Sequence, residues 1–309
     1  MIKSSSVTKE QLERKRQKRR HILAAAAFLL ITFTALIAID AYRCAHEFII
    51  TTYRFPSAKL SAPVTVGMVS DLHESEFGEN NRSLIEAVRR LEPDVILSNG
   101  DMISHNDTEE ELHVGLDFLE AMEAIAPVYL SLGNHETTYI AMHGTGLLDM
   151  YTQRGVRLLD KDYIDLELNG QTVRVGGISE YCFNYGQKWQ DYRASEKYAF
   201  LSGFCDTQSF SILLCHKPTA YYLESEAASY EDWDCDLVLS GHTHGGLWQL
   251  PLIGCPYLPQ QGMFPKYDKG QFDMGNAQMI IGAGLGHEGA FFRLADPCEL
   301  VVIELLPEA

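Results

Sequence analysis

The sequence predicts an α/β domain with two packed sheets and outer helices, preceded by a single membrane-spanning helix. Three observations predict this class: a long uncharged apolar stretch near the N-terminus, strands alternating with helices from Val64 onward, and a second half dominated by strands. The chain has 309 residues, of which 46% are hydrophobic and 22% are charged, so it can bury a large core.

The N-terminal segment has the charge pattern of a membrane anchor. Residues 1–21 contain eight Lys or Arg and two Glu, and residues 22–39 contain no charge. As a helix, residues 22–39 would cover about 27 Å, enough to cross a hydrocarbon layer. Because the basic side comes first, we expect residues 1–21 to be a cytoplasmic tail, residues 22–39 a transmembrane anchor, and the rest an extracytoplasmic part at the cell membrane.

A removable export signal is the alternative for this segment. The sequence around Arg19 and Arg20 resembles a twin-arginine signal. No A-x-A cleavage site follows the apolar stretch, which favours an uncleaved anchor.

The charge and cysteine content exclude some function classes. Residues 1–21 carry a net charge of +6, which leaves −23 for the remainder of a chain whose total is −17. So acidic a body offers no basic face for nucleic acid, and we expect no nucleic-acid-binding surface. The seven cysteines never stand as C-x-x-C and predict neither a zinc site nor a disulfide framework.

Strands and helices alternate in the first half of the body. We interpret residues 40–63 as a stalk and residues 64–306 as one domain. Thr108 is a candidate N-cap, followed by acidic residues and a leucine face. The pattern predicts strands over 64–70, 94–98 and 128–132, and helices over 81–93, 108–125 and 146–154.

The second half is dominated by strands. Residues 163–178 predict a hairpin that turns at Asn169-Gly170, a strong hairpin signal. Further strands are predicted over 210–215, 236–240, 277–283 and 299–305. This count fits a second sheet packed on the first, with helices outside.

Five of the predicted strands are followed directly by residues with carboxylate, amide or imidazole side chains. Side chains alternate along a strand, so two residues one position apart can point the same way, and ligands gather beyond the carboxyl ends of strands. We therefore expect convergence of Asp71, His73, Asp101, Asn134, His135, His216, His242 and His244.

The types of these side chains predict a metal centre. Imidazoles, carboxylates and one amide, without a thiolate, suit Mn, Fe or Zn better than Ca or Mg. The groups exceed what one ion needs, so we expect two divalent ions with Asp101 as the bridging ligand. Two such ions would also give an acidic domain a local positive centre for an anion.

The sequence resembles the calcineurin-like metallophosphoesterase family. The resemblance rests on five blocks in order: "DLH" (71–73), "GD" (100–101), "GNHE" (133–136), "CHKP" (215–218) and "GHTH" (241–244). Downstream, "MFPKYDKG" (263–270) and "GAGLG" (282–286) resemble the YkuE-like branch of membrane-associated phosphoesterases. The resemblance covers roughly residues 64–306.

The resemblance implies a four-layer α/β/β/α sandwich and a role for each site residue. Asp71, His73 and His244 would hold the first metal, Asp101 would bridge, and Asn134, His216 and His242 would hold the second. His135 would be the general acid or the donor to the transition state. Two adjacent ions can clamp a phosphoryl group for in-line attack.

We therefore expect a metal-dependent phosphodiesterase that acts on a small-molecule or lipid phosphoester, including envelope and nucleotide substrates. The alternatives are a phosphomonoesterase or protein phosphatase, and a noncatalytic metal-stabilised binding module. Four further residues are candidates to border the substrate pocket: His143, His287, Arg293 and Tyr267.

Overall fold

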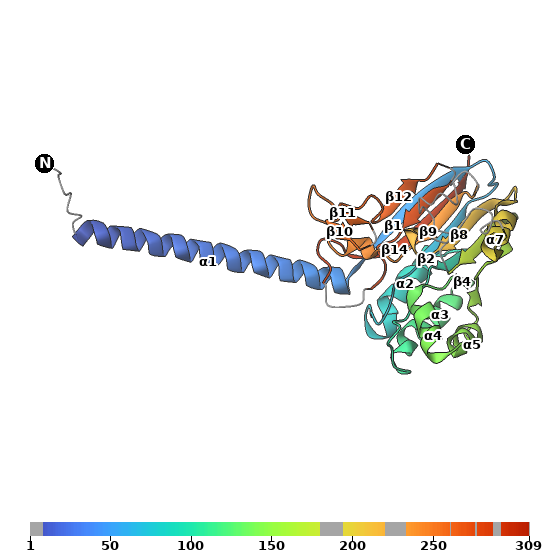
Figure 1. Cartoon of the computed structure of the whole chain (residues 1–309), viewed down its shortest axis with the longest axis horizontal. Helices are drawn as coiled ribbons and strands as arrows, with labels where there is room; N and C mark the ends of the chain where they lie inside the picture. The colour runs from blue at the N-terminus through green and yellow to red at the C-terminus, as the bar shows by residue number, and fades with distance from the viewer. Residues whose placement is uncertain are drawn as a thin grey trace.

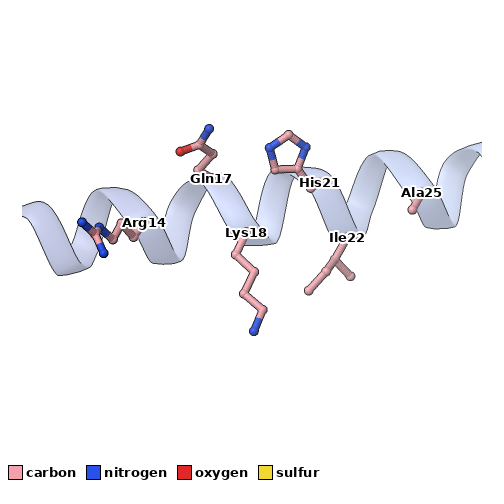
Figure 2. A pocket seen from close by; sticks show the side chains of 6 residues that line it. All are labelled: Arg14, Gln17, Lys18, His21, Ile22 and Ala25. Atoms are coloured by element: carbon pink, nitrogen blue, oxygen red, sulfur yellow. The ribbon is translucent and has the colours of Figure 1, made fainter.

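A computed structural model describes residues 9–179, 194–219, 233–259, 261–275, 277–286 and 292–308. One long helix, α1 (Lys9–His46), projects from a folded domain that contains all the other elements (Figure 1). Its span from Leu12 to His46 is long and apolar enough to cross a membrane. Figure 2 shows the polar side chains Arg14, Gln17, Lys18 and His21 on its N-terminal part, followed by Ile22 and Ala25.

The first sheet has six strands in the order β1-β14-β2-β3-β4-β5. Strands β2, β3, β4 and β5 are parallel, β14 is antiparallel to β2, and β1 is parallel to β14. The strands are β1 (Phe48–Ser57), β2 (Val64–Val69), β3 (Val95–Ser98), β4 (Val128–Leu130), β5 (Arg157–Leu158) and β14 (Cys298–Pro307).

The second sheet also has six strands, in the order β12-β13-β9-β8-β7-β6. The strands are β6 (Asp162–Leu168), β7 (Gln171–Ile178), β8 (Phe210–Cys215), β9 (Leu237–Ser240), β12 (Gly270–Asp273) and β13 (Gln278–Ile281). A short hairpin of β10 (Tyr257–Leu258) and β11 (Gly262–Met263) stands apart from both sheets.

Three apolar clusters separate four layers. The middle cluster joins inward-facing residues of both sheets, among them Val66 and Leu239. A second lies between the first sheet and its helices, and a third between the second sheet and α7. The helices are α2 (Arg82–Leu91), α3 (Leu112–Glu123), α4 (Asn134–His143), α5 (Gly146–Gln153) and α7 (Glu196–Cys205). The predicted four-layer α/β/β/α sandwich after an N-terminal apolar helix is confirmed.

Most predicted elements form within a few residues of their expected ends. The hairpin turns at Asn169 and Gly170, both with positive φ, as its β6–β7 register requires. Thr108 caps the start of the second predicted helix region, since its hydroxyl accepts from the backbone N–H of Glu111. The regular helix α3 begins at Leu112, later than expected.

The interpretation of residues 40–63 as a stalk is wrong for most of that range. Residues up to His46 continue α1, and Phe48–Ser57 form β1, which pairs with β14 along its whole length. Phe55 is 6% exposed in the core between the sheets. The folded domain therefore begins directly after the long helix.

Candidate metal centre

The predicted metal-binding side chains lie just beyond the ends of strands from both sheets. Strands β2 and β3 end at Val69 and Ser98, and strands β8 and β9 end at Cys215 and Ser240. The two sheets therefore deliver their polar residues to the same edge of the sandwich, the position where open α/β sheets bind ligands.

The backbone at this edge does not continue the strands. Left-handed φ values occur at five of the predicted ligands: Asp71 (54°), His73 (52°), Asp101 (51°), His242 (68°) and His244 (48°). Side-chain alternation along an extended strand was therefore the wrong reason for their shared direction. This conformation costs a residue with a Cβ about 1–2 kcal/mol, so the surrounding contacts must hold it in place.

The donor atoms gather in adjoining groups of three. Asp71, His73 and His244 form one group, and Asp101, His216 and His242 form another. A third group, of His73, Asp101 and His135, lies between them. In each group the possible ligand atoms lie within 4.8 Å of one another, so the geometry brings together two neighbouring candidate sites for an ion.

Buried polar atoms at this edge fit metal ions. Within the described part of the chain, Asp71 Oδ2, His73 Nε2 and Asn134 Oδ1 are buried and make no hydrogen bond. A buried polar atom without a partner costs about 1–3 kcal/mol. His216 Nε2 lies 2.9 Å from Asp101 Oδ2. Divalent ions bound at this edge would satisfy Asp71 Oδ2, His73 Nε2 and Asn134 Oδ1.

Hydrogen bonds on the far ring nitrogens orient three of the histidines. His216 Nδ1 lies 2.6 Å from the carbonyl oxygen of Asn99, and His244 Nδ1 lies 2.9 Å from that of Gly286. His73 Nδ1 lies 3.1 Å from Ser104 Oγ. Because a carbonyl only accepts, Nδ1 carries the proton in His216 and His244, which leaves Nε2 as the ligand atom.

Burial keeps three of the histidines neutral. Removal from water lowers the pKa of His73 to about 3, and neighbouring His244 adds to this effect. The pKa of His242 falls to about 2 and that of His244 to about 3, again mainly through removal from water. Neutral imidazole is the form that binds metals.

His216 differs because it faces a carboxylate. Burial alone would lower its pKa, but the contact with Asp101 raises the pKa to about 9. The same contact outweighs burial for Asp101 and holds the pKa of that carboxyl well below its usual range. In the metal-free protein these two residues form a buried ion pair, and a bound cation would replace the His216 proton.

Glu136 holds two of the site loops together. Its carboxylate accepts the backbone N–H groups of Asp101 (2.8 Å), Met102 (2.8 Å) and Gly133 (2.9 Å), and the hydroxyl of Tyr151 (3.2 Å). Burial raises its pKa to about 7, and repulsion from Asp101 acts in the same direction. The sequence shows an acid after "GNH", but this tie between loops is visible only in the fold.

Two glycines allow the loops to approach this closely. A Cβ added to Gly133 would lie 2.1 Å from Asp101 Oδ1, and one added to Gly241 would lie 2.3 Å from Asp71 Oδ2. Both distances are far below contact. Glycine is therefore required beside each carboxylate by space, in keeping with the expected close approach of the backbone.

His135 lies between the two candidate ion sites with its ring oriented by the neighbouring loop. The backbone N–H of His105 donates to His135 Nδ1 at 3.1 Å. Nδ1 is therefore the acceptor, so the proton of the neutral ring is on Nε2. Nε2 lies 4.0 Å from Asp101 Oδ2, and the ring lies 4.7 Å from that of His73. The predicted catalytic residue thus presents an N–H to the space between the groups.

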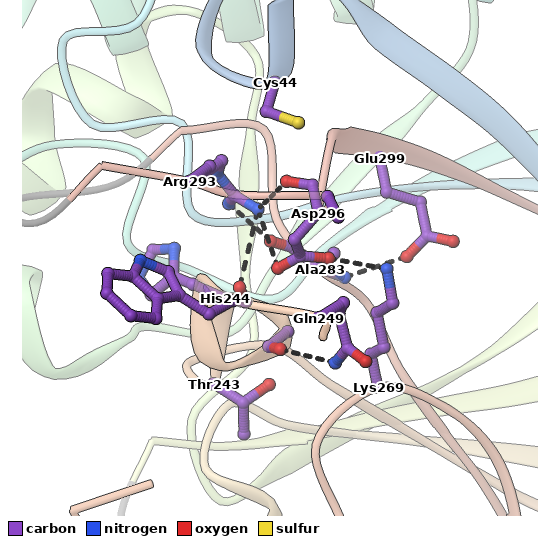
Figure 3. A network of polar contacts seen from close by, with 12 residues as sticks. Cys44, Thr243, His244, Gln249, Lys269, Ala283, Arg293, Asp296 and Glu299 are labelled. Atoms are coloured by element: carbon purple, nitrogen blue, oxygen red, sulfur yellow. Dashed lines mark hydrogen bonds and ion pairs between the residues drawn. The ribbon is translucent and has the colours of Figure 1, made fainter. Parts of the chain in front are cut away.

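Arg293 does not border the pocket as expected. It is fully buried behind His244, and its guanidinium donates to the carbonyls of Ala283 (2.6 Å) and Gly286 (2.6 Å). It also lies 3.4 Å from the carboxylate of Asp296, which Lys269 approaches to 2.5 Å (Figure 3). Since Gly286 also orients the His244 ring, this network supports one of the candidate ligands from behind.

The other pocket candidates have different positions. Tyr267 packs against Phe272 in the cluster outside the second sheet, and His143 is exposed at the end of α4. His287 lies outside the described residues.

The sandwich and the polar cluster at its edge together define a metal-dependent phosphoesterase. The family model for calcineurin-like phosphoesterase matches residues 64–246, and the chain belongs to this family. YkuE, an uncharacterized metallophosphoesterase of Bacillus subtilis (strain 168), is 28% identical over 240 residues, which cover 76% of this chain and 77% of that protein.

Two further relatives extend the comparison. An uncharacterized metallophosphoesterase of Aquifex aeolicus (strain VF5) is 28% identical over 269 residues, 84% of this chain and 90% of that protein. Phosphodiesterase YaeI of Escherichia coli (strain K12) is 25% identical over 258 residues, 80% of this chain and 83% of that protein. The expected YkuE-like branch is consistent with these relatives.

Proposed function

We propose that the chain is a dinuclear-metal phosphodiesterase. One observation carries the proposal: two groups of ligand-type atoms, each within 4.8 Å, adjoin through a third group that contains both Asp101 and His135. Asp71, His73 and His244 would hold one divalent ion, and Asn134, His216 and His242 the other, with Asp101 shared. Mn, Fe and Zn suit this donor set.

The bound ions would supply Lewis acidity toward a phosphoryl group and a nearby water. The protein's own residues orient the reaction. The water oxygen bonds to phosphorus, the P–O bond to one alcohol breaks, and a proton from the water passes to the departing alkoxide oxygen. His135, with its proton on Nε2, donates a hydrogen bond to the departing oxygen or to the charge that develops on the phosphoryl oxygens. The products are the alcohol and a phosphate monoester.

The preference for a diester is supported by the name of one relative, a phosphodiesterase. The rival function is a phosphomonoesterase or protein phosphatase. Rates with bis-p-nitrophenyl phosphate and p-nitrophenyl phosphate, measured on the metal-loaded full chain, separate the two. We expect a higher kcat/KM for the diester, and a strong preference for the monoester would contradict the proposal.

We further propose that the domain lies outside the cytoplasm at the cell membrane. The basic residues that precede the apolar span of α1 support this orientation. In sealed vesicles of known orientation, added protease should cleave the domain from the extracytoplasmic side and spare the N-terminal tail. Cleavage of the tail from that side would contradict the orientation.

A further inference from the structure

An apolar cavity opens beside the candidate metal centre. Its volume is about 500 Å³, within the usual range for a ligand pocket. His242 and His244 form part of its wall, and Leu247, Trp248 and Leu258 supply apolar surface opposite them. A group attached to a phosphoester bound at the metal centre would therefore enter an apolar space.

Most of the residues that line this cavity belong to a segment without charge. Residues 245–265 contain no Asp, Glu, Lys, Arg or His, although 22% of the chain is charged. The family match ends at Gly246, so residues 247–265 lie beyond the matched region. It forms the loop that contains the β10–β11 hairpin.

The outer face of the same segment exposes large apolar side chains. Leu252 is fully exposed, Met263 is 65% exposed and Phe264 is 63% exposed, with Ile253 and Tyr257 also exposed. A cluster of this kind on one loop marks an interaction surface. Its uncharged character and its aromatic residues suit the headgroup region of a bilayer, where aromatic rings are enriched.

The end of the membrane helix lies beside this surface. The carboxylate of Asp40, which directly follows the uncharged residues 22–39, accepts the backbone N–H of Ala295 at 2.6 Å. One turn further on, Cys44 is 4% exposed. The helix therefore docks on the domain immediately after its apolar span, which holds that part of the domain at the membrane surface.

The docking loop and the uncharged segment are hydrogen-bonded to each other. Leu294 donates to the carbonyl of Leu247 at 2.8 Å and accepts from Gln249 at 3.0 Å. Trp248 Nε1 donates to the carbonyl of Phe292 at 2.9 Å, and the two rings lie 5.6 Å apart. In Figure 1, β10 and β11 lie on the side of the domain from which α1 departs.

We propose that the substrate is a membrane lipid phosphoester whose hydrocarbon chain enters this cavity while the exposed face of residues 247–264 lies in the bilayer surface. The proposal rests on the proposed phosphodiesterase function and names its substrate class. Anchoring by α1 places the uncharged segment at the depth of the lipid phosphates. A lipid phosphate can then reach the metal centre with its chain still in apolar surroundings.

The test uses alkyl p-nitrophenyl phosphodiesters with methyl, octyl and hexadecyl chains and the metal-loaded full chain in lipid nanodiscs. The reacting bond is the same throughout. We expect kcat/KM to rise at least about tenfold from methyl to hexadecyl, since each buried methylene adds binding energy. Equal values along the series would overturn the lipid proposal, and absence of turnover for every diester would overturn the proposed function instead. A higher kcat/KM for a phenyl ester than for the hexadecyl ester would show that the cavity takes a ring, which also overturns the lipid proposal.

Two variants test the cavity and the outer face separately. Leu258→Trp fills the cavity and should bring the hexadecyl-to-methyl ratio close to one. Leu252→Asp with Ile253→Asp changes only exposed side chains and should lower turnover of the hexadecyl ester in nanodiscs at least about fivefold. Met142→Asp changes an apolar residue on α4 that is 61% exposed, close to the 57% of Ile253; it is the control and should have no effect. Equal loss in the control would contradict a specific surface.

A binding measurement keeps the proposal testable without turnover. Nanodiscs made with lipids brominated along the acyl chain should quench the fluorescence of Trp248, and the quenched component should disappear in Trp248→Phe. Quenching without turnover would support the membrane contact and refute the enzyme. Absence of quenching would overturn the membrane contact.

Discussion

At the residue scale, the site depends on the side chains of the sequence motifs. It also depends on backbone carbonyls and buried side chains that hold the motif residues in place and that the motifs do not reveal. The eight predicted polar residues follow strand ends, and the fold brings their loops to one edge. Backbone acceptors such as Asn99 and Gly286, and the buried network of Arg293, have no signal in the sequence. A carbonyl that orients an imidazole is a property of a loop conformation, which a residue pattern does not specify.

His135 should matter for chemistry and not for metal binding. In His135→Ala we expect kcat to fall by about 10²–10³, the usual cost of removing one hydrogen-bond donor to the transition state, with metal content unchanged. His143→Ala, an exposed change on the same helix, is the control and should retain full kcat. Unchanged turnover in metal-loaded His135→Ala would refute the assigned role.

Arg293 should act on one half of the metal centre. In Arg293→Met the carbonyls of Ala283 and Gly286 lose their donor, and the support behind His244 loosens. We expect metal content to fall from two ions to about one, with loss at the Asp71, His73 and His244 group. In Arg293→Lys the metal content should lie between one and two ions per chain, since lysine can still donate to part of these carbonyls. Loss of both ions in parallel with unfolding would indicate a purely structural role.

The pH dependence of stability in the metal-free protein should follow His216. Its folded pKa of about 9 lies above the unfolded value near 6.5, so the contribution is complete below pH 6.5 and is lost as pH rises through 9. The thermal midpoint of chelator-treated protein should fall between pH 6.5 and 9. This slope should be smaller in His216→Asn. A midpoint that rises over this interval would contradict the buried ion pair with Asp101.

At the element scale, the strands with continuous apolar runs were predictable and the exposed or irregular elements were not. Strand β8 (Phe210–Cys215) forms with its predicted bounds because all its residues are buried. Strand β1 was missed because most of its residues are partly exposed at a sheet edge. Helix α4 was missed because its sequence, NHETTYIAMH, lacks an apolar period, and its start depends on Glu136 and the Gly133 loop.

Strand β1 should contribute to the stability of the domain although it lies at an edge. Phe55→Ala removes a ring that is 6% exposed in the core and should lower the free energy of unfolding by about 3–5 kcal/mol. Ile49→Ala changes a side chain of the same strand that is 44% exposed and should cost much less. Equal midpoints for Phe55→Ala and the unchanged chain in denaturant titrations would show that β1 does not contribute.

At the scale of the whole molecule, one loop of the domain connects the long helix with the candidate metal centre. Asp40 contacts Ala295, and the adjoining loop carries Arg293 and Asp296, which lie behind His244 (Figure 3). The sequence predicts the two features that this loop connects, which are the apolar span and the histidine motif. The contact between them was not predictable, because the residues involved are far apart in sequence and belong to irregular loops.

The central claim is that two metal ions are held at one edge of the sandwich by side chains from separate loops. Metal content of the purified full chain, measured by mass spectrometry after dialysis, tests it most directly. We predict two equivalents of Mn, Fe or Zn per chain. A chain that retains no transition metal, or a single equivalent that survives Asp101→Ala unchanged, would contradict the account.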